Sequence, residues 1–122
     1  MVRAFSKKSI HILALTTLDT TDIGILRIVV DDPDAARELL VSQRYAFSES
    51  PILAVEIAGE RDIGGVLMAL LEAEVNIHYM YSFISRPMGR SALAMSIEDL
   101  DIAMDILRVR NHKVLSQRDI SR

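Results

Sequence analysis

Apolar and polar residues alternate loosely at the start of the chain and predict a β-hairpin. Residues 10–18 are rich in β-branched and aliphatic side chains, and residues 25–30 form a second apolar run. Between them, residues 19–24 combine Asp, Thr and Gly, whose side chains and permissive backbone favour a turn. The first expected unit of structure is therefore strand, turn, strand.

A helix is expected next, because the period of the apolar residues changes and the start signals are clear. Asp31 or Asp32 can cap the helix, Pro33 suits its first position, and Asp34 suits the positive end of the helix dipole. The following segment is extended, and Pro51 divides it into two expected strands, Tyr45–Ser48 and Ile52–Ala58.

The second half of the chain predicts a similar order of elements. A buried helical face has the spacing i, i+3, i+4, i+7, i+8 and comprises Ile63, Val66, Leu67, Leu70 and Leu71. The segments that follow are an expected strand over 75–84, a turn over 85–90, a strand over 91–97, a helix over 98–110 and a closing strand over 112–120.

These two halves form an internal repeat. Residues 25–40 align with residues 92–107 without a gap, at an offset of 92 − 25 = 67. The strands upstream align at an offset of 75 − 10 = 65, so the hairpin turns differ by two residues. Repetition of a strand and helix order at a fixed period is the signature of a duplicated structural unit.

The repeat predicts an α+β fold built from tandem ferredoxin-like βαββαβ units, with antiparallel sheets and the helices on one face. We expect a complete second unit over 52–122 and a partial first unit over 1–51, without its first strand and most of its first helix. By the offset that strand would begin at 53 − 67 = −14. A truncated or misassigned start is the favoured explanation, and completion by another subunit is the alternative.

Composition narrows the function classes. Half of the 122 residues are hydrophobic, so the chain is a folded globular protein. The absence of cysteine excludes disulfides and thiolate metal sites and fits a cytoplasmic location. A net charge of −3 argues against nucleic-acid binding, and no apolar run is long enough for a membrane span. We identify no cofactor, metal site or catalytic group.

Two adjacent glycines, Gly64 and Gly65, raise the first chemical question. Placed before a helix, they could simply allow a tight turn or close packing of helix on sheet. They could also expose backbone N–H groups at a helix start to a small anion, such as a carboxylate.

Particular segments resemble the ACT domain family, small regulatory modules that bind amino acids. The segment DIGGVLMALLEAEVNIHYMY over 62–81 is similar to the family's Pro-Gly-x-Leu helix start, helix and Asn-Ile strand. The hairpin DTTDIGILRIVVDD over 19–32 resembles one in small tandem ACT proteins. The chain departs from the family in having Ile63 where Pro is common, and in the longer loop AGERDI over 58–63.

The resemblance implies that a small ligand lies between the loop before one unit's first helix and the second strand of a neighbouring unit. It assigns the following residues to that site: Arg61, Asp62, Ile63, Gly64 and Gly65 on the loop, Asn76, Ile77 and His78 on one strand, and His11 and Ile12 on the other. The ordinary alternatives are an Asn that bonds to nearby backbone and partly exposed strand histidines.

The resemblance therefore implies a non-enzymatic regulatory protein that senses an amino acid or related metabolite and acts on a partner, such as a metabolic enzyme. Exposed sheet edges favour side-by-side pairing within the chain and between chains, so we also expect a homodimer. Two alternatives belong to other classes. One is an interaction subunit of an enzyme with no ligand site of its own. The other is a small phosphatase acting on acyl phosphates, which would use Arg61 and Asn76.

Overall fold

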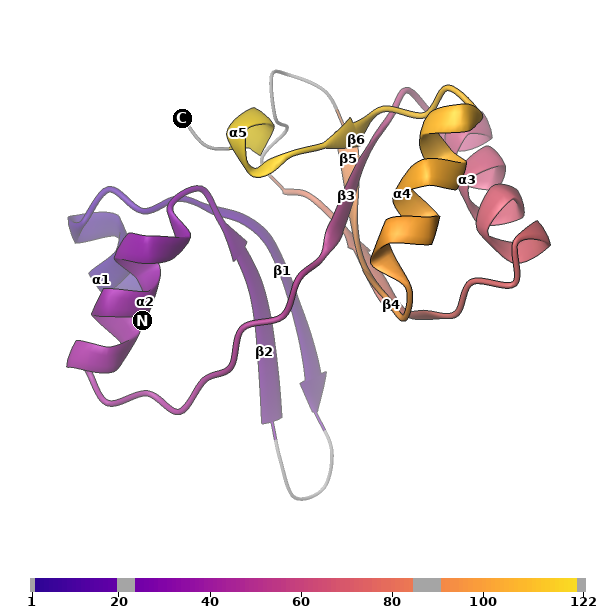
Figure 1. Cartoon of the computed structure of the whole chain (residues 1–122). Coiled ribbons are helices and arrows are strands. Elements are labelled where there is room, and N and C mark those ends of the chain that lie inside the picture. The colour runs from indigo at the N-terminus through magenta and orange to yellow at the C-terminus, as the bar shows by residue number, and fades with distance from the viewer. Residues whose placement is uncertain (1, 20–23, 85–90, 121–122) are drawn as a thin grey trace.

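The computed structural model describes residues 2–19, 24–84 and 91–120 of the chain (Figure 1). The predicted turns over 19–24 and 85–90 therefore lie almost entirely outside the described residues. In chain order, the helices and strands are α1 (Val2–Lys7), β1 (Ile12–Asp19), β2 (Gly24–Val30), α2 (Pro33–Ser42), β3 (Leu53–Ile57), α3 (Glu60–Glu72), β4 (Ile77–Ser82), β5 (Ser91–Ile97), α4 (Leu100–Val109), β6 (Val114–Leu115) and α5 (Gln117–Ile120).

The strands form two antiparallel sheets, which confirms the predicted α+β fold of tandem ferredoxin-like units. One sheet pairs β1 with β2, and the other has the order β4-β5-β3-β6. Figure 1 shows α1 and α2 on the outer side of the first sheet and α3 and α4 on the outer side of the second. The sheets therefore lie in the middle of the molecule, between two pairs of helices.

The internal repeat extends to the ends of the helices. The offset between α2 and α4 is 100 − 33 = 67, and both helices are capped by an aspartate, Asp32 and Asp99. A residue with positive φ follows each of the helices α1 to α4. Ser9 after α1 corresponds to Glu74 after α3, and Arg44 after α2 corresponds to Asn111 after α4. These local features are present in both units because each is encoded within a few residues of sequence.

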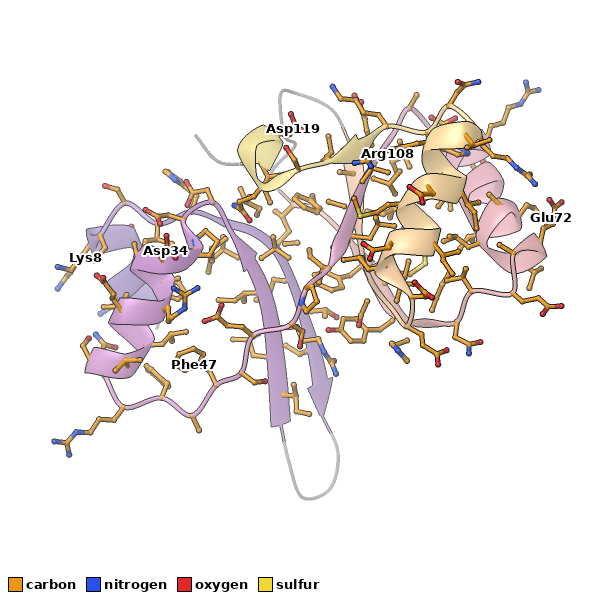
Figure 2. All side chains as sticks on the ribbon, viewed as in Figure 1. Lys8, Asp34, Phe47, Glu72, Arg108 and Asp119 are labelled. Carbon is orange, nitrogen blue, oxygen red and sulfur yellow. The ribbon has the colours of Figure 1, made fainter. Side chains whose placement is uncertain are left out.

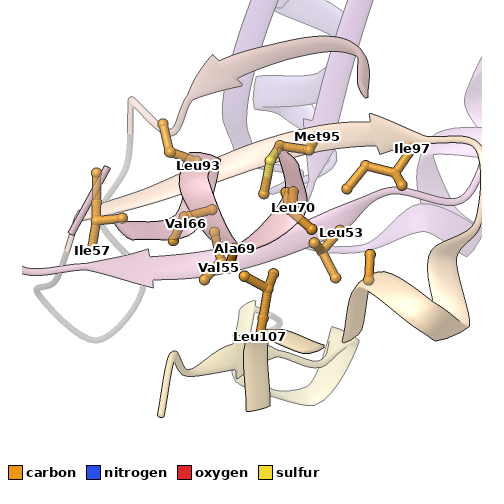
Figure 3. Close-up of a cluster of buried hydrophobic side chains, with 11 residues drawn as sticks. Leu53, Val55, Ile57, Val66, Ala69, Leu70, Leu93, Met95, Ile97 and Leu107 are labelled. Carbon is orange, nitrogen blue, oxygen red and sulfur yellow. The ribbon is translucent and has the colours of Figure 1, made fainter. Parts of the chain in front are cut away.

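Three apolar clusters hold the chain together. The largest lies between the four-stranded sheet and α3 and α4, and Figure 3 shows its members, which include Val55, Leu70, Met95 and Leu107. A smaller cluster around Phe5 joins α1 and α2 to the first sheet. All the residues named here are almost fully buried.

The third cluster joins the two sheets to each other through small residues. Ala14 of β1 and Ala94 of β5 are fully buried in it, together with Phe83 and Ile120. Ala14 forms an isolated antiparallel bridge with Phe83, and the N–H of Ile84 donates to the carbonyl of Leu13 at 2.6 Å. The second strands of the two units, β1 and β4, are thus neighbours at this end.

The predicted strand Tyr45–Ser48 is wrong, because this segment is extended but unpaired. Its counterpart in the second unit, β6, pairs with β3, and the described residues contain no equivalent of β3 beside β2. The segment is instead tied to α2 by an ion pair between Arg37 and Glu49, and Figure 2 shows Phe47 pointing from it back towards α2 and β2.

The closing strand predicted over 112–120 is also largely wrong. Only Val114 and Leu115 pair with β3, and the helix α5 begins two residues later. Ser116 and Asp119 explain the change. The N–H of Ser116 donates to Oδ2 of Asp119 at 2.8 Å, while the N–H of Asp119 lies 3.4 Å from Oγ of Ser116. This reciprocal pair is a capping box, which ends the strand by starting a helix.

The apolar face predicted for α3 needs one correction. Val66 and Leu70 are buried as expected, but Leu71 is 70% exposed and Ala69 is buried instead. The helix α4 packs along the side of α3 that carries Ala69, so the buried face is rotated away from Leu71.

Candidate functional site

The start of α3 differs from the predicted glycine loop. The helix begins at Glu60, with Gly59 as its N-cap in an extended conformation (φ 170°) and no side-chain cap. The N–H groups of Asp62 and Ile63 donate to the carbonyl of Gly59 at 3.1 and 3.3 Å. Arg61, Asp62 and Ile63 therefore lie in the first turn of the helix and not in a loop before it.

Gly64 and Gly65 lie inside α3, so their N–H groups point along the helix towards carbonyls four residues earlier. A Cβ at Gly65 would stand 3.3 Å from the ring of His112, whereas a Cβ at Gly64 would meet nothing within 4 Å. Close packing thus accounts for Gly65. Gly64 faces open space, and no contact within the described residues explains it.

Two carboxylates already lie at the start of α3. Glu60 and Asp62 are both in its first turn, and Oδ2 of Asp62 accepts a hydrogen bond from the N–H of Ala58 at 2.6 Å. These groups stabilise the positive end of the helix dipole. They would also repel a ligand carboxylate. A carboxylate bound here would therefore need a positively charged side chain beside it, and the exposed Arg61 can supply that charge.

The second group of predicted residues lies at the other end of the helix. Asn76, Ile77 and His78 follow the C-terminus of α3, which is 13 residues long and so spans about 20 Å. Nδ2 of Asn76 donates to Oε2 of Glu98 at 2.6 Å, Ile77 packs on the large core, and His78 is exposed. Within a single copy of the chain they therefore lie too far from Arg61 to share one small site with it.

His11 and Ile12 lie at the start of β1, near its junction with the end of β4. The N–H of His11 donates to Oδ1 of Asp31 at 2.8 Å, and Nδ1 of its ring lies 2.8 Å from Oδ2 of the same carboxylate. Burial of Asp31 alone would raise the pKa of its carboxyl, but the hydrogen bonds and charge of His11 outweigh that effect and hold the pKa below its usual value.

The contacts of His11 and Asn76 are equivalent in the repeat, since 76 − 11 = 65 and 98 − 31 = 67. Each joins the residue just before one strand to the residue just after the next strand, which is Asp31 in the first unit and Glu98 in the second. Asp31 is 7% exposed, whereas Glu98 is on the surface. The first unit therefore holds a partly buried pair where the second has an exposed amide and carboxylate.

The direction of the strands decides which predicted residues lie at the same end of the sheets. The start of α3 follows β3, and β4 and β5 place Phe83 at that same end, where it bridges to Ala14. His11 and Ile12, just before Ala14, are therefore at the same end as Arg61, while Asn76 is at the opposite end. The ligand-binding role of all these residues stays a prediction.

The sequence analysis missed a contact between the two units. The guanidinium carbon of Arg27 lies 4.0 Å from the ring centroid of Tyr79, and Tyr79 stacks on Tyr81 with 6.1 Å between centroids. Burial raises the pKa of Tyr81, with a further contribution from Tyr79. Tyr79 and Tyr81 share one side of a predicted strand, but nothing in the sequence indicated that Arg27 would meet them.

Two further properties of the described residues limit the chemistry. They contain no group of three or more histidine, aspartate and glutamate side chains that could hold a metal ion. None of their helices is long and apolar enough to cross a membrane.

Comparison with known proteins agrees with this architecture. The family model described as an ACT domain pair matches residues 1–122. The crystal structure of protein BT0572 from Bacteroides thetaiotaomicron is similar, with a TM-score of 0.86 and 25% sequence identity over 98% of this chain and 82% of that one. No curated protein is significantly similar to the chain.

Proposed function

Because the chain belongs to the family of ACT domain pairs, we propose that it is a non-enzymatic sensor that binds an amino acid or related metabolite between its two units. Members of this family act in general as regulatory, ligand-binding modules. The observation that carries the proposal is the direct junction of the two units through β1 and β4. A ligand that touches both units would stabilise one arrangement of the two units. A partner that binds the same arrangement would then bind more tightly.

The end of the sheets that carries Arg61, His11 and Ile12 is the favoured place for the ligand. The exposed Arg61 supplies a cation for a carboxylate and lies next to the positive end of the α3 helix dipole. The Asn76 end offers an amide group and the exposed His78 instead. We further propose a homodimer in the cytoplasm, in agreement with a chain that has no cysteine.

Thermal unfolding with each common amino acid at millimolar concentration tests the proposal. A ligand at 100 times its dissociation constant stabilises the folded state by about 2.7 kcal/mol, which corresponds to a rise in Tm of about 10 °C for a chain of this size. We expect such a shift with one or two amino acids.

Three variants then locate the ligand. Arg61→Ala should abolish the shift, while Arg108→Ala, which removes another exposed helical arginine, should leave it intact. If Asn76→Ala abolishes the shift and Arg61→Ala does not, the ligand binds at the opposite end. An unchanged Tm with every amino acid, from a folded sample, would contradict the sensor function.

The second candidate is an interaction subunit of a metabolic enzyme without a ligand site of its own. It is favoured by Asp62, whose carboxylate already occupies the start of α3. This function requires a flat response to amino acids together with stoichiometric co-purification of one enzyme.

A further inference from the structure

The outer edge of β2 has no strand beside it among the described residues. In the second unit the equivalent strand, β5, pairs along both of its edges, with β4 and with β3. The strand β2 pairs only with β1, in a regular register from Gly24 to Val29. A strand edge whose N–H and C=O groups are not paired within the sheet can accept a further strand.

The sequence of β2 does little to block such pairing. Proteins protect open edges with short strands, prolines and several charges. The strand β2 has seven residues, no proline and a single charged side chain, Arg27. The outer edge of β6, in contrast, is only two residues long and is followed closely by α5. The edge of β2 is therefore the better place for a polypeptide to pair.

The internal repeat indicates what fits along this edge. The offset between β2 and β5 is 91 − 24 = 67. The side of β5 that corresponds to the open edge pairs with the five-residue strand β3, which begins opposite Met95 and ends opposite Ser91. Moved back by 67 positions, this register places a five-residue strand antiparallel to β2, from Ile28 to Gly24.

Apolar side chains of β2 are exposed where such a strand would cover them. Leu26 is 42% exposed and Ile25 is 39% exposed, whereas their counterparts Leu93 and Ala92 are 5% and 1% exposed beside β3. Phe47, which is 40% exposed, points back towards α2 and β2 from the extended segment that follows α2 (Figure 2). The occupant must therefore present apolar side chains of its own.

Arg27 adds a requirement for charge. Its counterpart Ala94 lies opposite Ala54 of β3, so Arg27 would lie opposite the second residue of the added strand. Arg27 is half-buried against the ring of Tyr79, and none of the ion pairs between described residues involves it. Directly opposite residues share one side of a sheet. A carboxylate at that position would therefore meet the guanidinium, whereas a cation would be repelled.

We propose that the outer edge of β2, over residues 24–28, binds an extended segment of a partner protein as an added antiparallel strand. The segment has apolar side chains at its first, third and fifth positions and Asp or Glu at its second position, opposite Arg27. The inference goes beyond the proposed function, because the partner is a polypeptide and its binding requires no amino acid.

A second copy of this chain fits the edge less well. The strand with the required apolar pattern, β3, is already paired along both edges, with β5 and β6. The strand β2 of a second copy carries no acidic residue to face Arg27. The pattern of apolar residues together with the charge therefore favours a segment of another protein.

The strand β3 supplies the probe for a binding experiment. Three fluorescein-labelled peptides comprise residues 50–60 with Ala54→Glu, with Ala54→Lys, and with Ala54→Glu plus Val55→Pro. Fluorescence anisotropy measures the binding of each peptide to the full chain. We expect the glutamate peptide to bind about tenfold more tightly than the lysine peptide, because only its charge is opposite to that of Arg27. The proline peptide should not bind, because proline interrupts strand pairing.

Variants of the chain locate the contact. Arg27→Glu should reverse the preference in favour of the lysine peptide, and Arg27→Gln should bind both peptides equally. Leu26→Asn should weaken binding of the glutamate peptide about tenfold, because it removes an apolar contact. Val109→Asn changes an exposed apolar residue of α4 and should leave binding unchanged. Circular dichroism checks that each variant is folded.

Hydrogen exchange of the backbone amides then identifies the edge. The glutamate peptide should slow exchange in β2 about tenfold or more and leave β5 unchanged, because β5 is already paired on both sides. Three results would overturn the inference: a folded chain that binds none of the peptides, equal affinity for the glutamate and lysine peptides in both the wild type and Arg27→Glu, or protection of β6 in place of β2. Protection of β2 in a peptide-free dimer would also overturn it, by assigning the edge to a second copy.

Discussion

The first and second units have the same order of elements, but their equivalent side chains are buried to different extents. Leu26 of β2 is 42% exposed, while its counterpart Leu93 of β5 is 5% exposed. Ile28 is half-buried, while its counterpart Met95 is fully buried. The difference arises because β3 and the first turns of α3 cover β5, and the described residues place no such elements over β2.

This comparison separates what is local in the fold from what is not. The aspartate caps of α2 and α4 and the residues with positive φ are the same in both units, because each depends on a few neighbouring residues. Strand pairing beyond the hairpin and burial of the helical layer depend on elements distant in sequence, and these differ. Substitutions at equivalent positions should therefore have equal effects where the feature is local and unequal effects where it is not.

The largest difference between equivalent substitutions, measured as the free energy of unfolding, is expected in the helical core. Leu107 of α4 is fully buried, and its counterpart Leu40 of α2 is half-buried. Leu107→Ala should lower the free energy of unfolding by about 3 kcal/mol and Leu40→Ala by about half as much, because the cost includes the cavity left behind. Urea denaturation measures both, with the exposed Leu71→Ala as a control near zero. Equal losses at the two leucines would contradict the difference in burial.

Equal effects are expected at the helix caps. Asp32 accepts the N–H of Ala35 at 3.1 Å, and Asp99 accepts the N–H of Ile102 at 3.4 Å. Asp32→Ala and Asp99→Ala should each cost about 1 kcal/mol, with Asp32 at the upper side because its hydrogen bond is shorter. The measurement is again urea denaturation, and Asp32→Asn, which keeps the acceptor, should recover most of the loss. A cap that mattered in only one unit would show that the two helices are not equivalent.

The caps also show how much the sequence could predict. Asp32, Pro33 and the offset of 67 were sufficient to place α2 and α4, because helix starts are local signals. The strand predicted over Tyr45–Ser48 failed because its partner is not local. The segment 116–119 carried a capping box that the alternating pattern before it concealed.

The candidate site was harder to predict than the fold. Both groups of site residues were assigned to recognisable elements, but their arrangement depends on which ends of the strands meet. The sequence did not reveal that Glu60 starts the helix, which moved Gly64 and Gly65 into its interior. Nor could it reveal the contact of Arg27 with Tyr79, because that contact joins different units.

A smaller effect, confined to acid pH, is expected for the pair formed by His11 and Asp31. The folded state lowers the pKa of Asp31, so the carboxylate adds stability above its unfolded pKa, and this contribution is lost as the pH falls through the folded value. Asp31→Asn should therefore reduce the loss of stability between pH 5 and about 2. Urea denaturation at each pH measures the free energy of unfolding. Glu98→Gln, at the equivalent exposed position, should change that profile less. An identical change in both variants would show that burial of Asp31 contributes nothing.

The smallest effect concerns the two glycines, which have no matched pair in the first unit but can be compared with each other. Both are inside α3, where glycine is less favourable than alanine by about 0.5–1 kcal/mol. A Cβ at Gly64 would enter open space, so Gly64→Ala should raise the free energy of unfolding by about 0.5 kcal/mol. At Gly65 the new methyl group would stand 3.3 Å from the ring of His112, and Gly65→Ala should give no gain or a loss. The double variant Gly65→Ala with His112→Ala removes the ring and should recover the gain at residue 65. If Gly65→Ala stabilises the chain as much as Gly64→Ala, packing against His112 does not explain this glycine, and its role must be sought at the start of α3 with a bound ligand.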